Sequence, residues 1–177
     1  YKKTMTPSGH ILALAGGVGG AKLVRGLARV LDPGDLTVVV NTADDFEHLG
    51  LSISPDLDSV MYALAGLNDT ERGWGLREET WRFMHALERM KGQTWFSLGD
   101  QDLATHVLRT ERLRNGARLS EVTAELCSAL GIQHTVSPMA DQSIRTTVDT
   151  EEGPLPFQRY FVDRQCEPKV SGFRYVG

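Results

Sequence analysis

The sequence predicts an α/β fold, namely a Rossmann-like, doubly wound and mainly parallel sheet with helices on both faces, followed by a β-hairpin near the C-terminus. Apolar, β-branched runs alternate with segments of helical periodicity over about the first 140 residues, which favours right-handed crossovers and parallel strands. A glycine-rich turn joins the first apolar run to the first helix-like segment. Beyond residue 142 the texture changes to strand-like runs around the turn-rich "EEGPLP", which indicates the hairpin.

Each expected element has a local reason. Residues 10–17 form a short apolar run, and residues 36–45 contain the β-branched run typical of a strand buried on both faces. A further strand is expected at residues 93–100. Apolar residues at helical spacing, acidic first turns and a terminal glycine predict helices at residues 21–31, 54–67, 76–90, 102–113 and 119–131. The hairpin is expected from residues 143–150 and 157–163, with a last strand at residues 169–177.

Length and composition limit the possible classes of protein. The 177 residues suffice for one domain, expected at residues 10–177, and residues 1–9 are interpreted as a disordered end or an expression remnant. A net charge of −4 disfavours a nucleic-acid partner. Two cysteines without a CxxC pair give no zinc signature and suit a reducing compartment. The run "ILALA" is far shorter than the roughly 20 residues of a membrane span, so a cytoplasmic location is expected.

The stretch "AGGVGGAKLVRGLA" resembles a phosphate loop without matching either common motif. Lys22 occupies the third glycine position of G-x-G-x-x-G, and it follows Ala21 and precedes Leu23 where a Walker loop needs Gly-Lys-Ser/Thr. Glycines at a helix N-terminus can still point backbone amides at an anion, with Lys22 adding a charge. The alternative is a tight turn in which glycine only avoids clashes.

Four aspartates follow the second predicted strand. Asp44 and Asp45 lie at the end of the strand, and Asp56 and Asp58 lie at the start of the next helix. Carboxylates from these two positions suit Mg²⁺, which usually takes one or two carboxylates together with water and substrate phosphates. For any single aspartate, helix capping or plain solvation is the competing interpretation. As a group beside a phosphate loop, they favour a metal-assisted phosphoryl-transfer site.

The segment "SLGDQDLATH" adds a third polar cluster at an expected strand end, where parallel sheets place their ligands. Asp100 is favoured as a helix N-cap over a catalytic role. His48 and His106 are interpreted as polar neighbours, because neither has a second histidine at ligand spacing. Trp74, flanked by glycines, could stack on a planar ligand, although burial in a core is the common fate of tryptophan.

Five blocks in order carry a resemblance to a known family: "AGGVGGAKLVRGLA", "NTADDFEHLGLSISPDLDSVMYALAG", "GWGLREETW", "WFSLGDQDLATHVLRT" and "VSGFRYVG". From about Ile11 onward the chain resembles the 2-phospho-L-lactate transferase family of coenzyme F-420 biosynthesis. The resemblance implies a Rossmann-like fold, Mg²⁺ and a homodimer. It also implies transfer of a phospholactyl or phosphoenolpyruvyl group from a guanylyl diphosphate-type donor to the ribityl hydroxyl of the deazaflavin Fo, with GMP leaving.

The same resemblance implies roles for particular residues. Asp44, Asp45, Asp56 and Asp58 would be metal ligands, with Asp45 and Asp58 also catalytic. The residues implied to bind the donor's phosphates or to lie near the acceptor are Gly16, Gly17, Val18, Gly19, Gly20, Lys22, Asn41, Thr42, Trp74, Gly99 and Asp100. Members of the family continue well past "SGFRYVG" into a segment that completes the sheet and helps to hold the guanine nucleotide. The chain is therefore expected to lack a C-terminal portion.

Two other functions compete with this one. A related group of regulatory proteins shares the loop and the fold and binds nucleotide sugars, but the "ISPDLDS" and "GWG" blocks weigh against it. A nicotinamide-dependent oxidoreductase would need the third glycine that Lys22 replaces. The sequence leaves the choice between a lactyl and an enolpyruvyl donor open.

Overall fold

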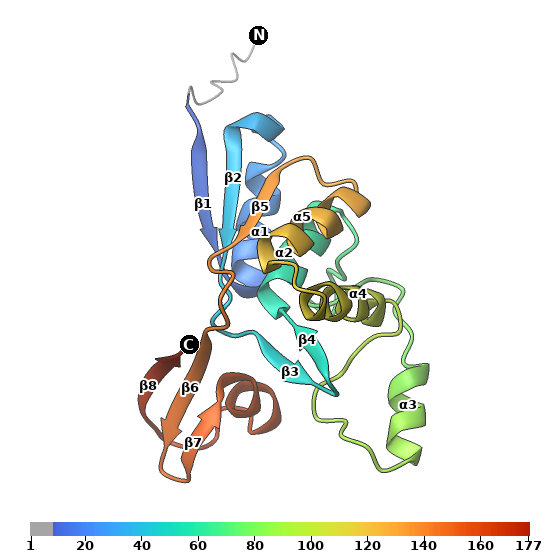
Figure 1. The fold of residues 1–177 in the computed structure, drawn as a ribbon, viewed down its shortest axis with the longest axis vertical. Helices are drawn as coiled ribbons and strands as arrows, with labels where there is room; N and C mark the ends of the chain where they lie inside the picture. Colours follow the sequence, from blue (N-terminus) through green and yellow to red (C-terminus); the bar gives the residue numbers. More distant parts are fainter. Residues whose placement is uncertain (1–8) are drawn as a thin grey trace.

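The computed structural model describes residues 9–177, so the expected loose end at residues 1–9 lies, apart from Gly9, outside the described residues. Figure 1 shows a parallel sheet with helices against it, a hairpin beyond the sheet's lower end, and an antiparallel sheet near the C-terminus. None of the helices in residues 9–177 is long and apolar enough to cross a membrane.

The parallel sheet has the strand order β1-β2-β5 and contains β1 (Ile11–Ala15), β2 (Leu36–Val40) and β5 (Thr135–Pro138). Its helices are α1 (Gly17–Leu27), α2 (Pro55–Leu64) and α5 (Leu119–Ala129), and the short 3₁₀ helix η1 (Pro33–Asp35) precedes β2. The main core lies between the sheet and these helices, where Val24, Val38, Val40, Leu57 and Val60 are completely buried. The predicted α/β class with parallel strands is confirmed.

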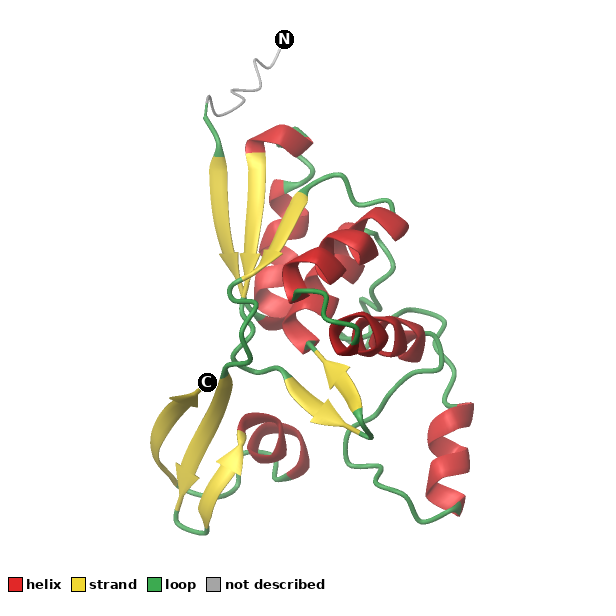
Figure 2. Cartoon of the chain, viewed as in Figure 1, coloured by secondary structure: helices red, strands yellow, loops and turns green. Residues whose placement is uncertain are grey.

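The helices cover one face of this sheet (Figure 2). On the other face, Leu12 and Leu14 are 60% and 70% exposed. The reason lies in the strand order, because both crossovers, β1 to β2 and β2 to β5, advance in the same direction. Right-handed crossovers in one direction place their helices on one side, whereas a doubly wound sheet needs strands added in both directions. The predicted second helical layer is therefore absent from residues 9–177.

The expected strand at residues 93–100 is wrong, since the connection between α3 (Arg82–Arg89) and α4 (Asp102–Arg114) is loop throughout (Figure 2). Its apolar residues pack instead of pairing in a sheet. Leu98 is fully buried against Ile53 and Met84 in a second hydrophobic cluster, and Phe96 packs against this cluster. The third parallel strand is β5, which the sequence did not predict. The helix expected at residues 76–90 is also shorter than predicted.

The loop after β2 continues into a hairpin of β3 (Phe46–His48) and β4 (Leu51–Ile53), which the sequence also did not predict. The C-terminal sheet has the order β7-β6-β8 and contains β6 (Arg145–Thr150), β7 (Gly153–Pro156) and β8 (Val170–Val176). The first strand of the predicted hairpin, at residues 143–150, is confirmed as β6. The second strand, predicted at residues 157–163, is wrong, because most of that segment forms the short π-helix η2 (Arg159–Asp163) and β6 pairs with β7 instead.

Candidate functional site

A large cavity, of about 1010 Å³, lies at the carboxyl ends of β1 and β2, as expected for a parallel sheet. Its polar wall includes Gly16, Gly17, Asn41, Asp44, Asp56, Asp58, Asp102 and His106. Its apolar wall includes Trp74, Trp95, Phe96, Phe157 and Phe161. A cavity of this size has room for more than one small molecule, and its two walls suit a charged and a planar group.

The glycines of the loop have different duties. Gly17 has φ +57°, and a Cβ on Gly16 would lie 3.3 Å from the Asp56 Oδ2. These two glycines let the start of α1 approach the carboxylate closely. A Cβ on Gly20 would lie 3.0 Å from the Ala15 Cα, so Gly20 lets α1 pack on β1. Clash avoidance therefore describes part of the loop, and ligand binding by Gly16 and Gly17 stays a prediction.

The remaining loop residues are placed less directly. Val18 lines the large cavity, whereas a Cβ on Gly19 would meet no atom within 4 Å. Lys22 lines a neighbouring cavity of about 80 Å³ that it shares with Val18 and Trp74. Lys22 does not line the large cavity, so the phosphate that it is predicted to contact would have to reach the neighbouring cavity.

Asn41 joins two of the four predicted aspartates. Its Nδ2 donates to the Asp44 Oδ2 and to the Asp56 Oδ2, each at 3.0 Å, and its Oδ1 accepts from the backbone N–H of Ala43 at 3.1 Å. The backbone N–H of Gly17 also donates to Asp56. Burial raises the pKa of both carboxyl groups above the ordinary value, and the hydrogen bonds from Asn41 oppose this shift. Within residues 9–177 neither carboxylate has an ion-pair partner, so their charge is available to a cation.

Asp45 points to a different partner. The hydroxyl of Ser54 donates to its Oδ2 at 2.7 Å, while its buried Oδ1 has no hydrogen-bond partner within the described part of the chain. Burial raises the pKa of Asp45 from 3.8 to about 7, against the effect of the Ser54 hydrogen bond. Thr42 is buried beneath this turn, and its carbonyl oxygen accepts from the Asp45 N–H at 3.1 Å. Thr42 therefore supports the turn and does not line the cavity.

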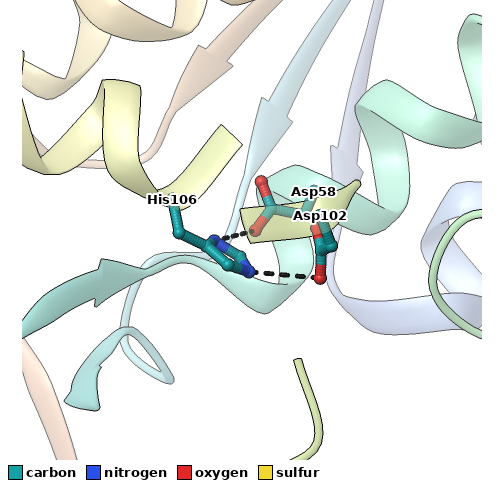
Figure 3. A group of neighbouring side chains, drawn as sticks. All are labelled: Asp58, Asp102 and His106. Atoms are coloured by element: carbon teal, nitrogen blue, oxygen red, sulfur yellow. Dashed lines mark ion pairs between the residues drawn. The ribbon is translucent and has the colours of Figure 1, made fainter. Parts of the chain in front are cut away.

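Asp58 lies in a buried ionic cluster with residues of α4 (Figure 3). The Arg109 guanidinium donates to both carboxylate oxygens of Asp58, with Nη1 at 3.2 Å from Oδ2. The ring of His106 lies between two carboxylates, with Nδ1 3.7 Å from the Asp58 Oδ2 and Nε2 3.1 Å from the Asp102 Oδ2. Asp58, Asp102 and His106 could by spacing hold a metal ion. The guanidinium already neutralises Asp58 and would repel a cation there.

Tyr62 connects this cluster to the cavity. Its hydroxyl donates to Asp102 and lies 3.0 Å from the Thr105 Oγ1. Burial, together with the charges of Asp58 and Asp102, raises the Tyr62 pKa well above its ordinary value, so this phenol stays protonated. Burial alone would raise the pKa of Asp102, but hydrogen bonds and the charge of His106 hold it below its ordinary value. Asp102 is thus an ionised acceptor.

Asp100 and Gly99 have structural duties. Asp100 accepts the backbone N–H groups of Arg82 and Phe83 at 3.1 and 3.0 Å, which caps the start of α3. Glu79 accepts the N–H of Gln101 at 2.8 Å and thereby caps the start of α4. Neither Gly99 nor Asp100 lines the large cavity. The capping interpretation of Asp100 describes its contacts, although the helix that it caps is not the one that follows it.

Trp74 is 44% exposed and lines the cavity, so its predicted stacking role remains open to a ligand. The Arg72 guanidinium lies 5.2 Å from its ring centroid, and Trp81 packs edge-on at 5.9 Å. Sequence reasoning missed Trp95 and the stacked pair Phe157 and Phe161 on the same apolar wall. Their only sequence signal is the aromatic residue type.

Known proteins resemble the chain over most of its length. The family described as 2-phospho-L-lactate transferase CofD matches residues 11–177. A phosphoenolpyruvate transferase of Streptomyces avermitilis is 44% identical over 168 residues, covering 92% of this chain and 53% of the relative. A 2-phospho-L-lactate transferase of Methanosarcina mazei is 38% identical over 162 residues, covering 92% and 54%. The chain thus spans about half the length of the curated relatives that it matches.

A solved structure supports the fold. The crystal structure of a UPF0052 family protein from Bacillus halodurans superposes with a TM-score of 0.57 at 16% identity, covering 96% of this chain and 51% of that one. Identity this low supports the architecture alone.

Proposed function

Because this chain belongs to the 2-phospho-L-lactate transferase family, we propose that it transfers a phospholactyl or phosphoenolpyruvyl group in the biosynthesis of coenzyme F-420. The donor is a guanylyl diphosphate-type molecule, the acceptor is the ribityl hydroxyl of the deazaflavin Fo, and GMP leaves. The observation that carries the proposal is one cavity with a carboxylate wall at the glycine loop and an aromatic wall opposite. These walls suit the donor's diphosphate and the planar deazaflavin.

The carboxylate wall fits a magnesium ion. Asp44 is half-buried and Asp56 is buried; both share the amide of Asn41, and neither has a cationic partner within residues 9–177. Hard carboxylate oxygens in this number are what Mg²⁺ takes in nucleotide sites, where it neutralises phosphate charge. We therefore place the ion on Asp44 and Asp56, a narrower set than the four aspartates predicted from the sequence. Asp58 is already paired, and Asp45 faces Ser54.

The chain's own groups have separate tasks in this reaction. At the start of α1 the Gly17 N–H already donates to Asp56, so the next two amides, those of Val18 and Gly19, would bind the donor's phosphate oxygens. Asp58 lines the cavity and is held by Arg109, so it can accept a hydrogen bond from the acceptor hydroxyl and align it for attack. The aromatic wall would hold the deazaflavin ring and exclude water. Phosphoryl transfer depends mainly on such alignment and charge neutralisation.

The test is a transfer assay on the intact protein. Incubation with Fo, Mg²⁺ and each donor in turn should yield the phosphorylated deazaflavin and GMP, both detected by mass spectrometry. Asp56→Asn should reduce turnover strongly, whereas Asp32→Asn, an exposed aspartate in the loop before β2, should leave it unchanged. If neither donor gives product, the assignment is wrong. Retained nucleotide-sugar binding without Fo binding would then favour the regulatory alternative.

A further inference from the structure

A second cavity, of about 390 Å³, lies behind the carboxylate wall. It shares Asp44, Trp95, Phe157 and Gln158 with the large cavity, so these four residues separate the two spaces. The rest of its wall comes from the loop after β2, from β3 and from the start of β6, strands that diverge below the parallel sheet in Figure 1. The backbone N–H of Thr146 donates to the Ala43 carbonyl at 2.6 Å and fixes β6 against that loop.

Unpartnered polar atoms gather at this cavity. Four side chains that line the cavity each carry one buried atom without a hydrogen-bond partner within residues 9–177, namely Asp45 Oδ1, His48 Nε2, Trp95 Nε1 and Arg145 Nη1. His48 is only 3% exposed. A buried polar group without a partner costs free energy, and most such groups in native proteins are satisfied by protein, water or ligand. Four such side chains around one cavity favour a polar ligand there.

The chemistry of these atoms favours an anion. The Trp95 indole and the Arg145 guanidinium can only donate. Arg145 forms no ion pair with any carboxylate of residues 9–177, although Asp45 is near enough to be influenced by its charge. The Arg159 guanidinium lies 3.9 Å from the Trp95 ring centroid, but it is already paired with Asp163 at 3.0 Å, so Arg145 is the unpaired positive charge on this wall. The ligand should therefore carry acceptor oxygens and a negative charge.

A singly charged carboxylate fits better than a phosphate dianion. Asp44, Asp45 and Glu47 also line the cavity and would repel a dianion. A carboxylate offers two coplanar oxygens, which can accept from Arg145 and from Trp95 or His48 together.

We propose that this cavity binds the carboxylate of the three-carbon acid group that the donor carries, with Arg145 as its counter-ion. The inference rests on the proposed function, since both phospholactyl and phosphoenolpyruvyl groups bear a carboxylate on the carbon attached to the phosphate oxygen. Asp44 is common to both cavities. A donor whose phosphates lie at Asp44 and the glycine loop therefore has its carboxylate within reach of the second cavity.

Binding measurements without acceptor test this site separately from turnover. The probes are phosphoenolpyruvate, 2-phospholactate and isopropyl phosphate, the last having the same three-carbon skeleton without a carboxylate, each titrated calorimetrically with Mg²⁺ present. The two carboxylates should bind about tenfold or more tightly than isopropyl phosphate, as a charge-assisted hydrogen bond to a buried arginine implies. Both carboxylate probes should also shift the NMR resonance of the Trp95 indole N–H. This resonance is assigned as the one that disappears in Trp95→Phe.

Arg145→Met should abolish the preference for carboxylates, and Arg145→Lys should retain part of it, because lysine keeps the charge but not the forked geometry. Arg164→Met is the matched control, since Arg164 is an exposed arginine of the same C-terminal region that lines neither cavity. If Arg145→Met does not fold, Trp95→Phe, which removes one N–H and keeps an aromatic ring, should still weaken carboxylate binding.

Equal affinity of the wild type for phosphoenolpyruvate and isopropyl phosphate would overturn the inference. So would a carboxylate preference that survives in both Arg145→Met and Trp95→Phe. A preference that Arg145→Met abolishes, in a protein that gives no product with Fo, would support the cavity and refute the proposed transfer. If Arg145→Met still forms product and its KM for the donor is unchanged, the proposed transfer is supported and the carboxylate site is refuted.

Discussion

Replacing Arg109 by methionine tests the buried ionic cluster most directly. Arg109 is 1% exposed and is the only guanidinium that the described residues place on Asp58, itself 5% exposed. The Asp58 charge raises the pKa of Arg109 despite complete burial, so the pair is ionised. Methionine keeps most of the length of the apolar stem and removes the charge. The substitution therefore leaves a buried carboxylate without its counter-ion.

The expected loss of unfolding free energy is about 3–5 kcal/mol, the usual result of removing one partner of a buried ion pair. Two further contacts disappear with the guanidinium, since Arg109 Nη1 also lies 3.4 Å from the Ser52 carbonyl oxygen and 3.4 Å from the His106 Nδ1. A domain of this size is stable by only about 5–15 kcal/mol. The single variant should thus lose a large fraction of its stability.

A double-mutant cycle measured by urea denaturation separates the pair from general damage. Asp58→Asn removes the charge that Arg109→Met leaves behind, so the double variant should be more stable than the two single losses predict, by about 1–3 kcal/mol. The control is Arg112→Met on the same helix α4, which breaks an exposed ion pair between Arg112 and Glu125 of α5 and should change little. Additive losses in the cycle, or an Arg109→Met variant as stable as the control, would refute the assignment of a buried ion pair.

Three further predictions follow from the site. The folded pKa of Asp45, about 7, exceeds its ordinary 3.8, so the folded state loses stability as pH rises between these values. Asp45→Asn removes this loss, which accrues at about 1.36 kcal/mol per pH unit, so urea titrations should show a stabilisation that is larger at pH 8 than at pH 5 by about 3 kcal/mol. Gly20→Ala should cost about 1–3 kcal/mol through its contact with β1, whereas thermal denaturation should find Gly19→Ala tolerated. Asp44→Asn and Asp56→Asn should each weaken Mg²⁺ binding in calorimetry by at least about tenfold, since even groups that only orient a ligand contribute that much.

The parallel sheet could be predicted where local pattern and tertiary burial agree. The run "LTVVV" is β-branched and buried, and it forms β2 as expected. The third strand was missed because "TVSP" offers four residues, two of them with hydroxyl side chains. Residues 93–100 were mistaken for it because Trp95, Phe96 and Leu98 have strand-like composition. Their burial comes from packing on the β3–β4 hairpin and α3, a contact that no local pattern encodes.

The location of the candidate site was predictable, and its internal division was not. Polar segments after consecutive strands converge in a parallel sheet, and Asp44 and Asp56 do share one cavity wall. His106 and Arg109 lie three residues apart and share one face of α4, which the sequence analysis did not single out. Nothing in the sequence paired that face with Asp58, because the partner lies 51 residues away on another helix. Asp45 likewise differs from its neighbour Asp44 only through the fold that buries it.

The different partners of the four aspartates reduce the electrostatic repulsion between their carboxylates. Four ionised carboxylates in one cleft would repel one another strongly at low dielectric. The fold neutralises Asp58 with Arg109 and lets Asp45 be protonated near neutral pH, while Asn41 holds Asp44 and Asp56 together with their charges unpaired by any cation of residues 9–177. Two negative charges therefore remain at the mouth of the glycine loop. That number would balance one divalent cation held by Asp44 and Asp56, which would supply charge neutralisation to the donor's phosphates.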